Sequence, residues 1–138
     1  MSEVAFIALG SNLGDRTAYL EMGRAAIGRL EGTTITARSD IEETEPFGES
    51  GQGPYLNQMV AIQTTLTPSE LLAALKSIER AAGRIRSDVK WGPRTLDLDI
   101  VTFGDRNVNE SGLTVPHPGL ADRDFWQREI AQIQGARP

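Results

Sequence analysis

Two aspartates, Asp97 and Asp99, have the residue type and spacing that most directly suggest chemistry in this sequence. They lie in the segment WGPRTLDLDIVTF (91–103), where they alternate with aliphatic residues. Alternate residues of a β-strand point to the same face, about 6.6 Å apart along the chain, so both carboxylates are predicted on one face. Because neighbouring carboxylates repel and carboxylate oxygens suit Mg²⁺, the pair predicts a site for one metal ion, or for two about 3.5–4 Å apart. The alternative is an edge strand with a polar outer face, since this motif alone is a weak signal.

Basic residues gather just before this strand. The stretch RAAGRIRSDVKWGPR (80–94) contains one acidic residue, Asp88, and five basic ones: Arg80, Arg84, Arg86, Lys90 and Arg94. Metal-binding carboxylates beside several cations are the combination that phosphate chemistry uses. The alternative is a solvated helix end, where cations are also favourable. The net charge of −5 and the pI near 4.9 disfavour nucleic acid as a partner.

Two further side chains are candidates for the same site. His117 is the only histidine and stands between Pro116 and Pro118, which hold the segment extended and stiff. Trp91 lies in a loop bounded by Gly92 and Pro93 and is either a lid residue or an ordinary core tryptophan. A lone histidine is more often structural than catalytic, so neither residue decides the function.

The elements that must position these residues follow from pattern and capping signals. Strands are predicted at 3–10, 33–43, 55–66 and 96–103, and helices at 15–30 and 67–83. Asp15 is a predicted N-cap, and Thr67 with Glu70 forms a predicted capping box. Loops are predicted at 46–54 and 84–95, and the tail from 104 is predicted as turns with a helix at 122–133. The order β-α-β-β-α-β predicts an α+β, ferredoxin-like fold with two helices on a four-stranded antiparallel sheet.

Length and composition favour one domain, 1–138. The sequence contains no apolar run of about 18 residues and no signal-peptide pattern, so no membrane association is expected. It also contains no cysteine, which fits a reducing cytoplasm. We therefore expect a cytoplasmic protein.

Five blocks of the sequence together resemble the 6-hydroxymethyl-7,8-dihydropterin pyrophosphokinase family of folate biosynthesis. These blocks are ALGSNLGDR (8–16), ETEPFG with GPYLNQMV (43–60), GRIR (83–86), WGPRTLDLDI (91–100) and TVPHPGLADRDF (114–125). The resemblance implies a ferredoxin-like core in α/β/α layers. It also implies an ATP-dependent diphosphokinase that transfers pyrophosphate from Mg²⁺-ATP to the hydroxymethyl group of 6-hydroxymethyl-7,8-dihydropterin and releases AMP. We expect two Mg²⁺ ions and a monomer.

The resemblance also assigns roles residue by residue. The implied catalytic residues are Arg84, Arg94, Asp97 and Asp99, and the last two are the implied metal ligands. The implied ATP-binding residues are Arg86, Trp91, Ile100, Thr114, His117 and Arg123. The implied pterin-binding residues are Thr44, Tyr55, Asn57 and Phe125. A flat pterin suits stacking between the rings of Tyr55 and Phe125, and an amide such as that of Asn57 offers the donor and acceptor that its edge needs.

The sequence departs from the family pattern at two places. Ser87 stands where many members have a basic residue, and the C-terminal end is shortened and lacks a proline-containing block. Two other functions are therefore weighed. One is a non-catalytic nucleotide- or pterin-binding ferredoxin-like module, and the other is a metal-dependent nuclease, which would want a basic groove.

Overall fold

The fold is seen in a computed structural model of the chain, which describes residues 2–44, 54–83, 96–110 and 112–135. Its elements along the chain are β1 (Glu3–Ser11), α1 (Arg16–Gly28), β2 (Thr33–Arg38), β3 (Glu42–Thr44), β4 (Tyr55–Thr64), α2 (Pro68–Ala81), β5 (Asp97–Phe103), β6 (Val108–Glu110), β7 (Leu113–Val115) and α3 (Asp124–Gly135). The predicted loops at 46–54 and 84–95 lie almost wholly outside the described residues.

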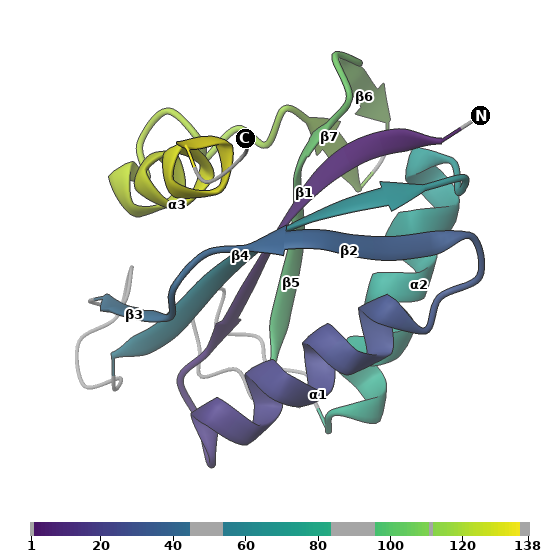
Figure 1. The fold of residues 1–138 in the computed structure, drawn as a ribbon. Helices are drawn as coiled ribbons and strands as arrows, with labels where there is room; N and C mark the ends of the chain where they lie inside the picture. Colours follow the sequence, from purple (N-terminus) through teal and green to yellow (C-terminus); the bar gives the residue numbers. More distant parts are fainter. Residues whose placement is uncertain (1, 45–53, 84–95, 111, 136–138) are drawn as a thin grey trace.

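The main sheet has the strand order β2-β4-β1-β5, and the short strand β3 also pairs with β4. All these pairings are antiparallel. Helices α1 and α2 cover one face of the sheet and α3 covers the other (Figure 1). The predicted ferredoxin-like fold in α/β/α layers is thereby confirmed.

Both long helices begin where their sequences predict. Asp15 caps α1 by accepting a hydrogen bond from the backbone N–H of Ala18, at 3.1 Å. In α2, the hydroxyl of Thr67 accepts from the N–H of Glu70, and the Glu70 carboxylate accepts from the N–H of Thr67. These reciprocal bonds satisfy two N–H groups that the helix leaves without partners.

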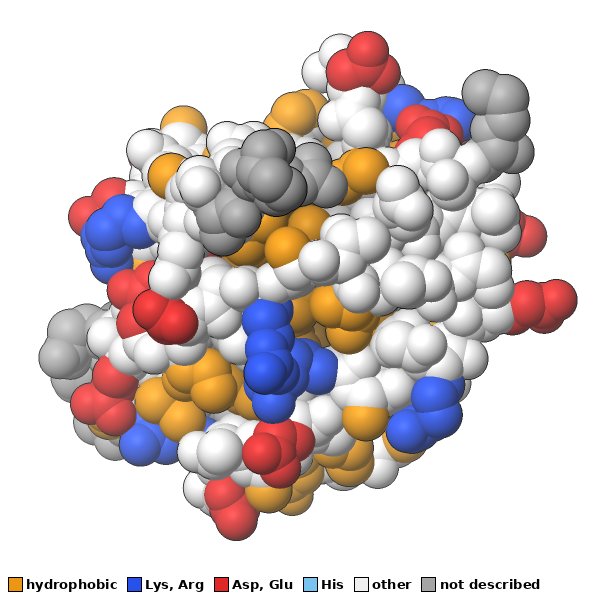
Figure 2. All heavy atoms as spheres, in the orientation of Figure 1, with side chains coloured by type: hydrophobic (Ala, Val, Ile, Leu, Met, Phe, Trp, Pro, Cys, Tyr) orange, Lys and Arg blue, Asp and Glu red, His pale blue; other side chains and the backbone are white. Residues whose placement is uncertain are grey.

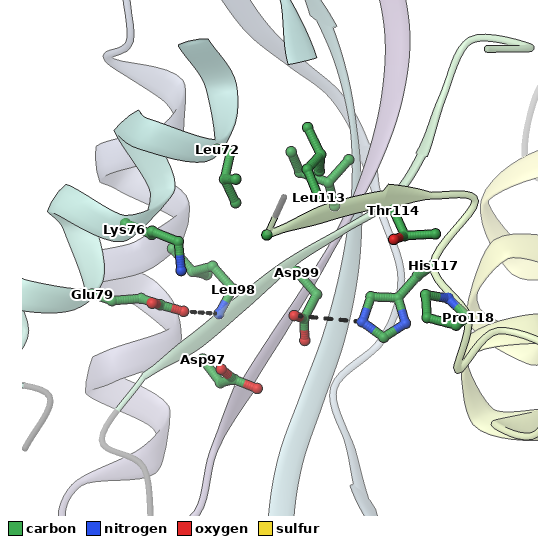
Figure 3. A pocket seen from close by; sticks show the side chains of 12 residues that line it. Leu72, Lys76, Glu79, Asp97, Leu98, Asp99, Leu113, Thr114, His117 and Pro118 are labelled. Atoms are coloured by element: carbon green, nitrogen blue, oxygen red, sulfur yellow. Dashed lines mark hydrogen bonds and ion pairs between the residues drawn. The ribbon is translucent and has the colours of Figure 1, made fainter. Parts of the chain in front are cut away.

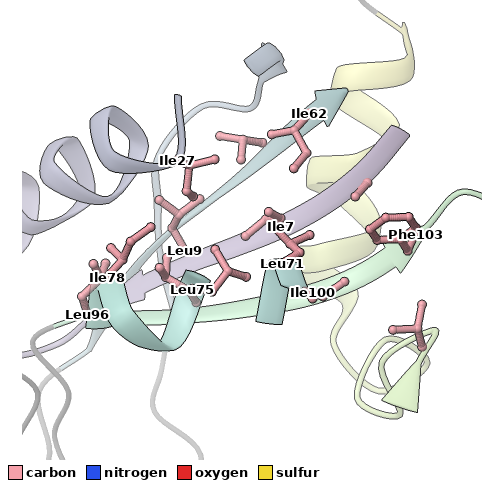
Figure 4. Packing of buried hydrophobic residues seen from close by; sticks show 14 of the residues in the cluster. Ile7, Leu9, Ile27, Ile62, Leu71, Leu75, Ile78, Leu96, Ile100 and Phe103 are labelled. Carbon is pink, nitrogen blue, oxygen red and sulfur yellow. The ribbon is translucent and has the colours of Figure 1, made fainter. Parts of the chain in front are cut away.

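The two faces of the sheet bury separate hydrophobic clusters. Figure 4 shows the larger one, in which Ile7 and Leu9 of β1 pack against Leu71 and Leu75 of α2. The smaller cluster lies under α3 and includes Phe6, Ala8, Met59, Val101, Trp126 and Ile133. Successive residues of β1 alternate between the two clusters, as strand geometry requires.

Strand β5 departs from regular alternation. Phe6 pairs with Thr102 and Ile7 pairs with Ile100, so Val101 has no partner in the register and forms a β-bulge. The bulge lets Val101 join the cluster under α3 and returns Phe103 to the larger cluster, with Leu98 and Ile100. The bulge comes after Asp99, so the residues before it still alternate. Leu98 and Ile100 face the larger cluster, and Asp97 and Asp99 share the opposite face, toward α3, as predicted.

Two expectations outside the helices were wrong in detail. The strand predicted at 33–43 is divided into β2 and β3, because the backbone between them turns so that the Ser39 hydroxyl accepts from the N–H of Met59 and its carbonyl accepts from the Gln58 side chain. The tail, predicted as turns before its helix, contains the hairpin β6–β7, whose strands of three residues are too short to show a period. The predicted C-terminal helix is confirmed as α3, two residues further along.

Candidate active site

A pocket of about 350 Å³ opens beside β5, on the edge of the sheet that faces α2. Figure 3 shows the side chains around it. The lining residues come from three elements: Leu72, Lys76 and Glu79 from α2, Asp97 to Ile100 from β5, and Gly112, Leu113, Thr114, His117 and Pro118 from β7 and its flanks. The pocket therefore gathers Asp97, Asp99, Ile100, Thr114 and His117, five of the residues that the sequence assigned to metal and ATP.

The aspartates sit opposite small residues of β1. Asp97 pairs with Gly10 and Asp99 pairs with Ala8, and both carboxylates remain partly exposed. Neither partner places a long side chain beside the carboxylates. Among the described residues, one other acidic side chain lines the pocket, that of Glu79, which is 5% exposed.

His117 faces Asp99 across the pocket. Its Nε2 lies 3.8 Å from the Asp99 Oδ1, and its Nδ1 accepts a hydrogen bond from the Gly119 N–H at 2.9 Å. Burial lowers the pKa of His117, the nearby Arg123 lowers it further, and Asp97 opposes the shift. The imidazole is therefore neutral at physiological pH with its proton on Nε2, and its contact with Asp99 is that of a neutral N–H aimed at a carboxylate rather than an ion pair.

A side chain of α2 binds the backbone between the two aspartates. The Glu79 Oε2 accepts a hydrogen bond of 2.7 Å from the backbone N–H of Leu98, the residue between Asp97 and Asp99 (Figure 3). Because β5 is an edge strand, this N–H points away from β1 and would otherwise lack a strand partner. Sequence reasoning missed Glu79, although a carboxylate four residues after Leu75 on the buried stripe of α2 was a usable signal.

Three of the residues assigned to the pterin, Thr44, Tyr55 and Asn57, lie on β3 and β4, on the face of the sheet that carries Asp97 and Asp99. Asn57 of β4 pairs with Gly10 of β1, and the Asn57 side-chain amide donates to the hydroxyl of Thr44 in β3. A side chain on Gly10 would come within 3.3 Å of the Asn57 Oδ1 and 3.4 Å of the Tyr55 ring. The backbone of Gly10 thus lies directly against the side chains of Asn57 and Tyr55.

Phe125 and Arg123 lie at the start of α3. Phe125 is 9% exposed and belongs to the cluster under α3. The guanidinium carbon of Arg123 lies 4.4 Å from the centre of the Trp126 ring, a cation–π contact. Four assigned residues lie outside the described residues: Arg84, Arg86, Trp91 and Arg94.

Asp97 and Asp99 are the carboxylates of this pocket that could bind a metal ion. Within residues 2–44, 54–83, 96–110 and 112–135, no group of three or more His, Asp or Glu side chains is placed to hold one. Two neighbouring carboxylates nevertheless fit Mg²⁺, which binds one or two carboxylates and completes its shell with water and phosphate oxygens. The pair fits a metal that arrives with a nucleotide better than a permanently held structural ion.

A second buried carboxyl group, Glu129 of α3, lies away from this pocket, in a small depression that Asp40, Glu42, Arg128 and Gln132 also line. Glu129 is 2% exposed, and among the described residues no group donates a hydrogen bond to either of its carboxyl oxygens. Burial, then a hydrogen bond that the protonated Glu129 makes with the Glu42 carboxylate and the negative charge of that carboxylate, raise the pKa of Glu129 to about 9. The group is therefore protonated in the folded protein at neutral pH.

Comparisons with known proteins give a consistent result. The sequence model of the 7,8-dihydro-6-hydroxymethylpterin-pyrophosphokinase (HPPK) family matches residues 6–135. A 2-amino-4-hydroxy-6-hydroxymethyldihydropteridine pyrophosphokinase of Bacillus subtilis (strain 168) is 44% identical over 133 residues, which cover 96% of this chain and 79% of that protein. The folic acid synthesis protein fol1 of Schizosaccharomyces pombe is 36% identical over 132 residues, 96% of this chain but 18% of that longer protein.

One solved structure adds to the picture of the fold. A crystal structure of HPPK-DHPS in complex with substrates superposes with a TM-score of 0.59 and 15% sequence identity, covering 80% of this chain and 29% of that one. At this identity the similarity concerns the fold alone. No helix among the described residues has the length and apolar character needed to cross a membrane.

Proposed function

The chain belongs to the 7,8-dihydro-6-hydroxymethylpterin-pyrophosphokinase family, and from that premise we propose how its residues carry out the reaction. It is a pyrophosphokinase of folate biosynthesis that transfers pyrophosphate to hydroxymethylpterin, with ATP as co-substrate. Family membership supports this enzymatic function and does not favour a binding module without turnover.

One observation carries the assignment of the reaction to this face of the sheet. Asn57, Gly10 and Asp97 are successive partners across β4, β1 and β5. Two strand spacings put the backbones of Asn57 and Asp97 about 10 Å apart, with their side chains on one face and with Gly10, which has no side chain, on the strand between them. A flat substrate whose edge is bound at Asn57 would then extend toward the phosphates at Asp97.

The aspartates bind the metal ion in this proposal. Asp97 and Asp99 would hold Mg²⁺, which would supply positive charge to offset the negative charge of the phosphates. Asp97 and Asp99 are on one rigid strand, and Glu79 fixes the backbone between them. Their positions are therefore set before the nucleotide arrives, which lowers the cost of orienting it.

The pterin is held by polar contacts at its edge and by rings on its faces. Asn57 and Thr44 hydrogen-bond to each other, so each holds the other in place for the substrate edge. The rings of Tyr55 and Phe125 stack on the two faces of the pterin. These contacts orient the hydroxymethyl oxygen toward the nucleotide, and catalysis then rests on positioning and charge stabilisation.

His117 and Arg123 bind the phosphates of ATP from the opposite side. The neutral His117 donates from Nε2, and the guanidinium of Arg123 supplies positive charge. Asp99 faces the same Nε2 at 3.8 Å, so the metal ligand and the phosphate donor border one space. Ile100 and Thr114 line that space, and we assign them to the nucleotide as well.

Several finer features remain our predictions. They are a second Mg²⁺ ion, a monomeric state, a cytoplasmic location, a single domain over 1–138, and the roles of Arg84, Arg86, Trp91 and Arg94. The nuclease alternative is not supported by charge: on the face shown in Figure 2, acidic and basic side chains are interspersed and no continuous basic surface crosses it.

The proposed function is tested by product analysis. The protein is incubated with ATP, Mg²⁺ and 6-hydroxymethyl-7,8-dihydropterin, and the products are separated and weighed by mass spectrometry. AMP and the pterin diphosphate should appear in equal amounts, and AMP should not form without the pterin. Formation of ADP with a pterin monophosphate, or no pterin product at all, would contradict the proposal.

A further inference from the structure

Trp126 is a buried aromatic residue that neither the metal nor the pterin assignment uses. It lies in the first turn of α3, is 3% exposed, and belongs to the cluster under that helix. A core role would account for its burial. Its neighbours, however, include both residues assigned to the phosphates of ATP.

Both neighbours contact the ring of Trp126. The His117 ring centre lies 4.9 Å from the Trp126 ring centre, and the two planes meet at 87° in an edge-to-face arrangement. The Arg123 guanidinium carbon lies 4.4 Å from the centre of the same ring. Edge-to-face and cation–π contacts both depend on direction, so one ring constrains two polar side chains.

The turn between these residues is closely packed as well. A side chain on Gly119 would come within 3.0 Å of the Arg123 Nε and 3.1 Å of the His117 Nδ1. The N–H of Gly119 donates to the His117 Nδ1 at 2.9 Å, and the N–H of His117 donates to the carbonyl of Val101 at 2.8 Å. The turn is thereby tied to the bulge of β5 at Val101, two residues after Asp99.

We propose that Trp126 is a positioning residue for ATP, because its ring holds His117 and Arg123 in the directions that the phosphates require. This inference rests on the proposed function of those two residues. It gives neighbouring residues of α3 different tasks: Phe125 serves the pterin and Trp126 serves the nucleotide. A purely structural tryptophan would instead affect both ligands through the stability of α3.

The test compares Trp126→Leu, which removes the ring, with Trp126→Phe, which keeps a smaller ring. Ile133→Val is the matched control, because Ile133 is 1% exposed on the same helix and in the same cluster. Affinities for a non-hydrolysable ATP analogue with Mg²⁺ and for the pterin are measured separately. We expect Trp126→Leu to lower the affinity for the ATP analogue about tenfold and the affinity for the pterin less than about twofold. The affinities of Trp126→Phe should lie between those of wild type and Trp126→Leu.

A spectroscopic readout covers positioning directly. Because His117 is the only histidine, its ring signals in NMR are unambiguous, and removal of the Trp126 ring current should shift them in both Trp126 variants but not in Ile133→Val. Unchanged His117 signals, or an equal loss of affinity for the ATP analogue and for the pterin, would overturn the inference. If Trp126→Leu does not fold, the same two criteria apply to Trp126→Phe. Failure of the wild-type protein to bind the ATP analogue would instead count against the proposed function.

Discussion

Asn57 and Asp97 flank Gly10 on one face of the sheet, each as its direct partner in a neighbouring strand. The register therefore brings together residues 40 positions apart in the sequence, and the residue between them, Gly10, contributes no side chain. The same register sets Ala8 between Met59 and Asp99. Two small residues of β1, Gly10 and Ala8, thus lie between these residues of β4 and the aspartates of β5.

Gly10→Ala should weaken pterin binding without harming the fold. The added methyl group would lie 3.3 Å from the Asn57 Oδ1 and 3.4 Å from Tyr55, and it would occupy the floor of the proposed pterin site. Alanine suits a strand at least as well as glycine, so the midpoint of thermal unfolding should not fall by more than a few degrees. Pterin affinity measured by calorimetry should drop severalfold.

Gly28→Ala is the control for this change, because a side chain there meets nothing closer than 3.8 Å. Gly28→Ala should leave the affinities for the pterin and for ATP unchanged. Pterin affinity in Gly10→Ala equal to that of wild type would mean that the substrate does not approach this part of β1.

Phe125→Ala should weaken pterin binding by about 1–3 kcal/mol, the range measured for base–aromatic stacking, and change ATP binding little. Phe125 also packs edge-to-face on Trp126, at 6.2 Å between ring centres, so the stability of the variant must be measured alongside. Phe125→Leu keeps an apolar side chain without a ring and separates stacking from packing. Equal loss of ATP and pterin affinity would indicate a general disturbance of α3 instead of a stacking role.

Glu79→Ala should raise the Mg²⁺ concentration needed for half-maximal activity. Its carboxylate accepts from the N–H between the two aspartates, and loss of a partner for a buried N–H costs about 1–3 kcal/mol. Glu79→Gln retains an acceptor oxygen of similar reach and should recover most of the Mg²⁺ response. The exposed Glu21 of α1 provides a control, Glu21→Ala. A Mg²⁺ titration with identical midpoints in Glu79→Ala and wild type would exclude this positioning role.

The pH dependence of stability should reflect Glu129. Its pKa rises from the ordinary 4.5 to about 9 on folding, so the folded state retains a proton that the unfolded state loses. The stabilisation is complete below pH 4.5 and is progressively lost as pH rises toward 9. Above pH 9 the loss should level off.

Glu129→Gln mimics the protonated carboxyl group and should remove this slope. Urea unfolding at several pH values between 5 and 9 gives the two profiles. The free energy of unfolding of Glu129→Gln, relative to wild type, should therefore increase with pH across that window. Parallel profiles would show that Glu129 ionises in the folded state with an ordinary pKa.

The sequence predicted what depends on local pattern. Capping residues such as Asp15 and Thr67 placed two helices, and alternation placed Asp97 and Asp99 on one face, because these signals are read within a few residues. It did not predict the bulge at Val101, which arises from pairing with β1, or the contact from Glu79, which requires the packing of α2 on β5. Those features depend on residues far apart in the chain.

The pocket was predictable in composition but not in arrangement. The resemblance assigned His117 and Arg123 to the nucleotide, yet gave no sign that Trp126 contacts both. The hydrogen bond from Gly119 to the His117 Nδ1, which fixes the proton on Nε2, depends on a turn geometry that the sequence PHPGL does not state. Side-chain directions of this kind are set by tertiary packing.

The central claim is that the Asp97–Asp99 pair is the metal site of pyrophosphoryl transfer, and the most direct measurement is the initial rate of AMP formation in Asp97→Asn and Asp99→Asn. Asparagine keeps the shape of each side chain and removes its charge, and Asp105→Asn, in the exposed turn after β5, is the matched control. With saturating ATP, pterin and Mg²⁺, each of the first two variants should lose at least about a hundredfold in rate while remaining folded, and the control should match wild type. A near-normal rate in Asp97→Asn or Asp99→Asn at saturating Mg²⁺ would contradict the account.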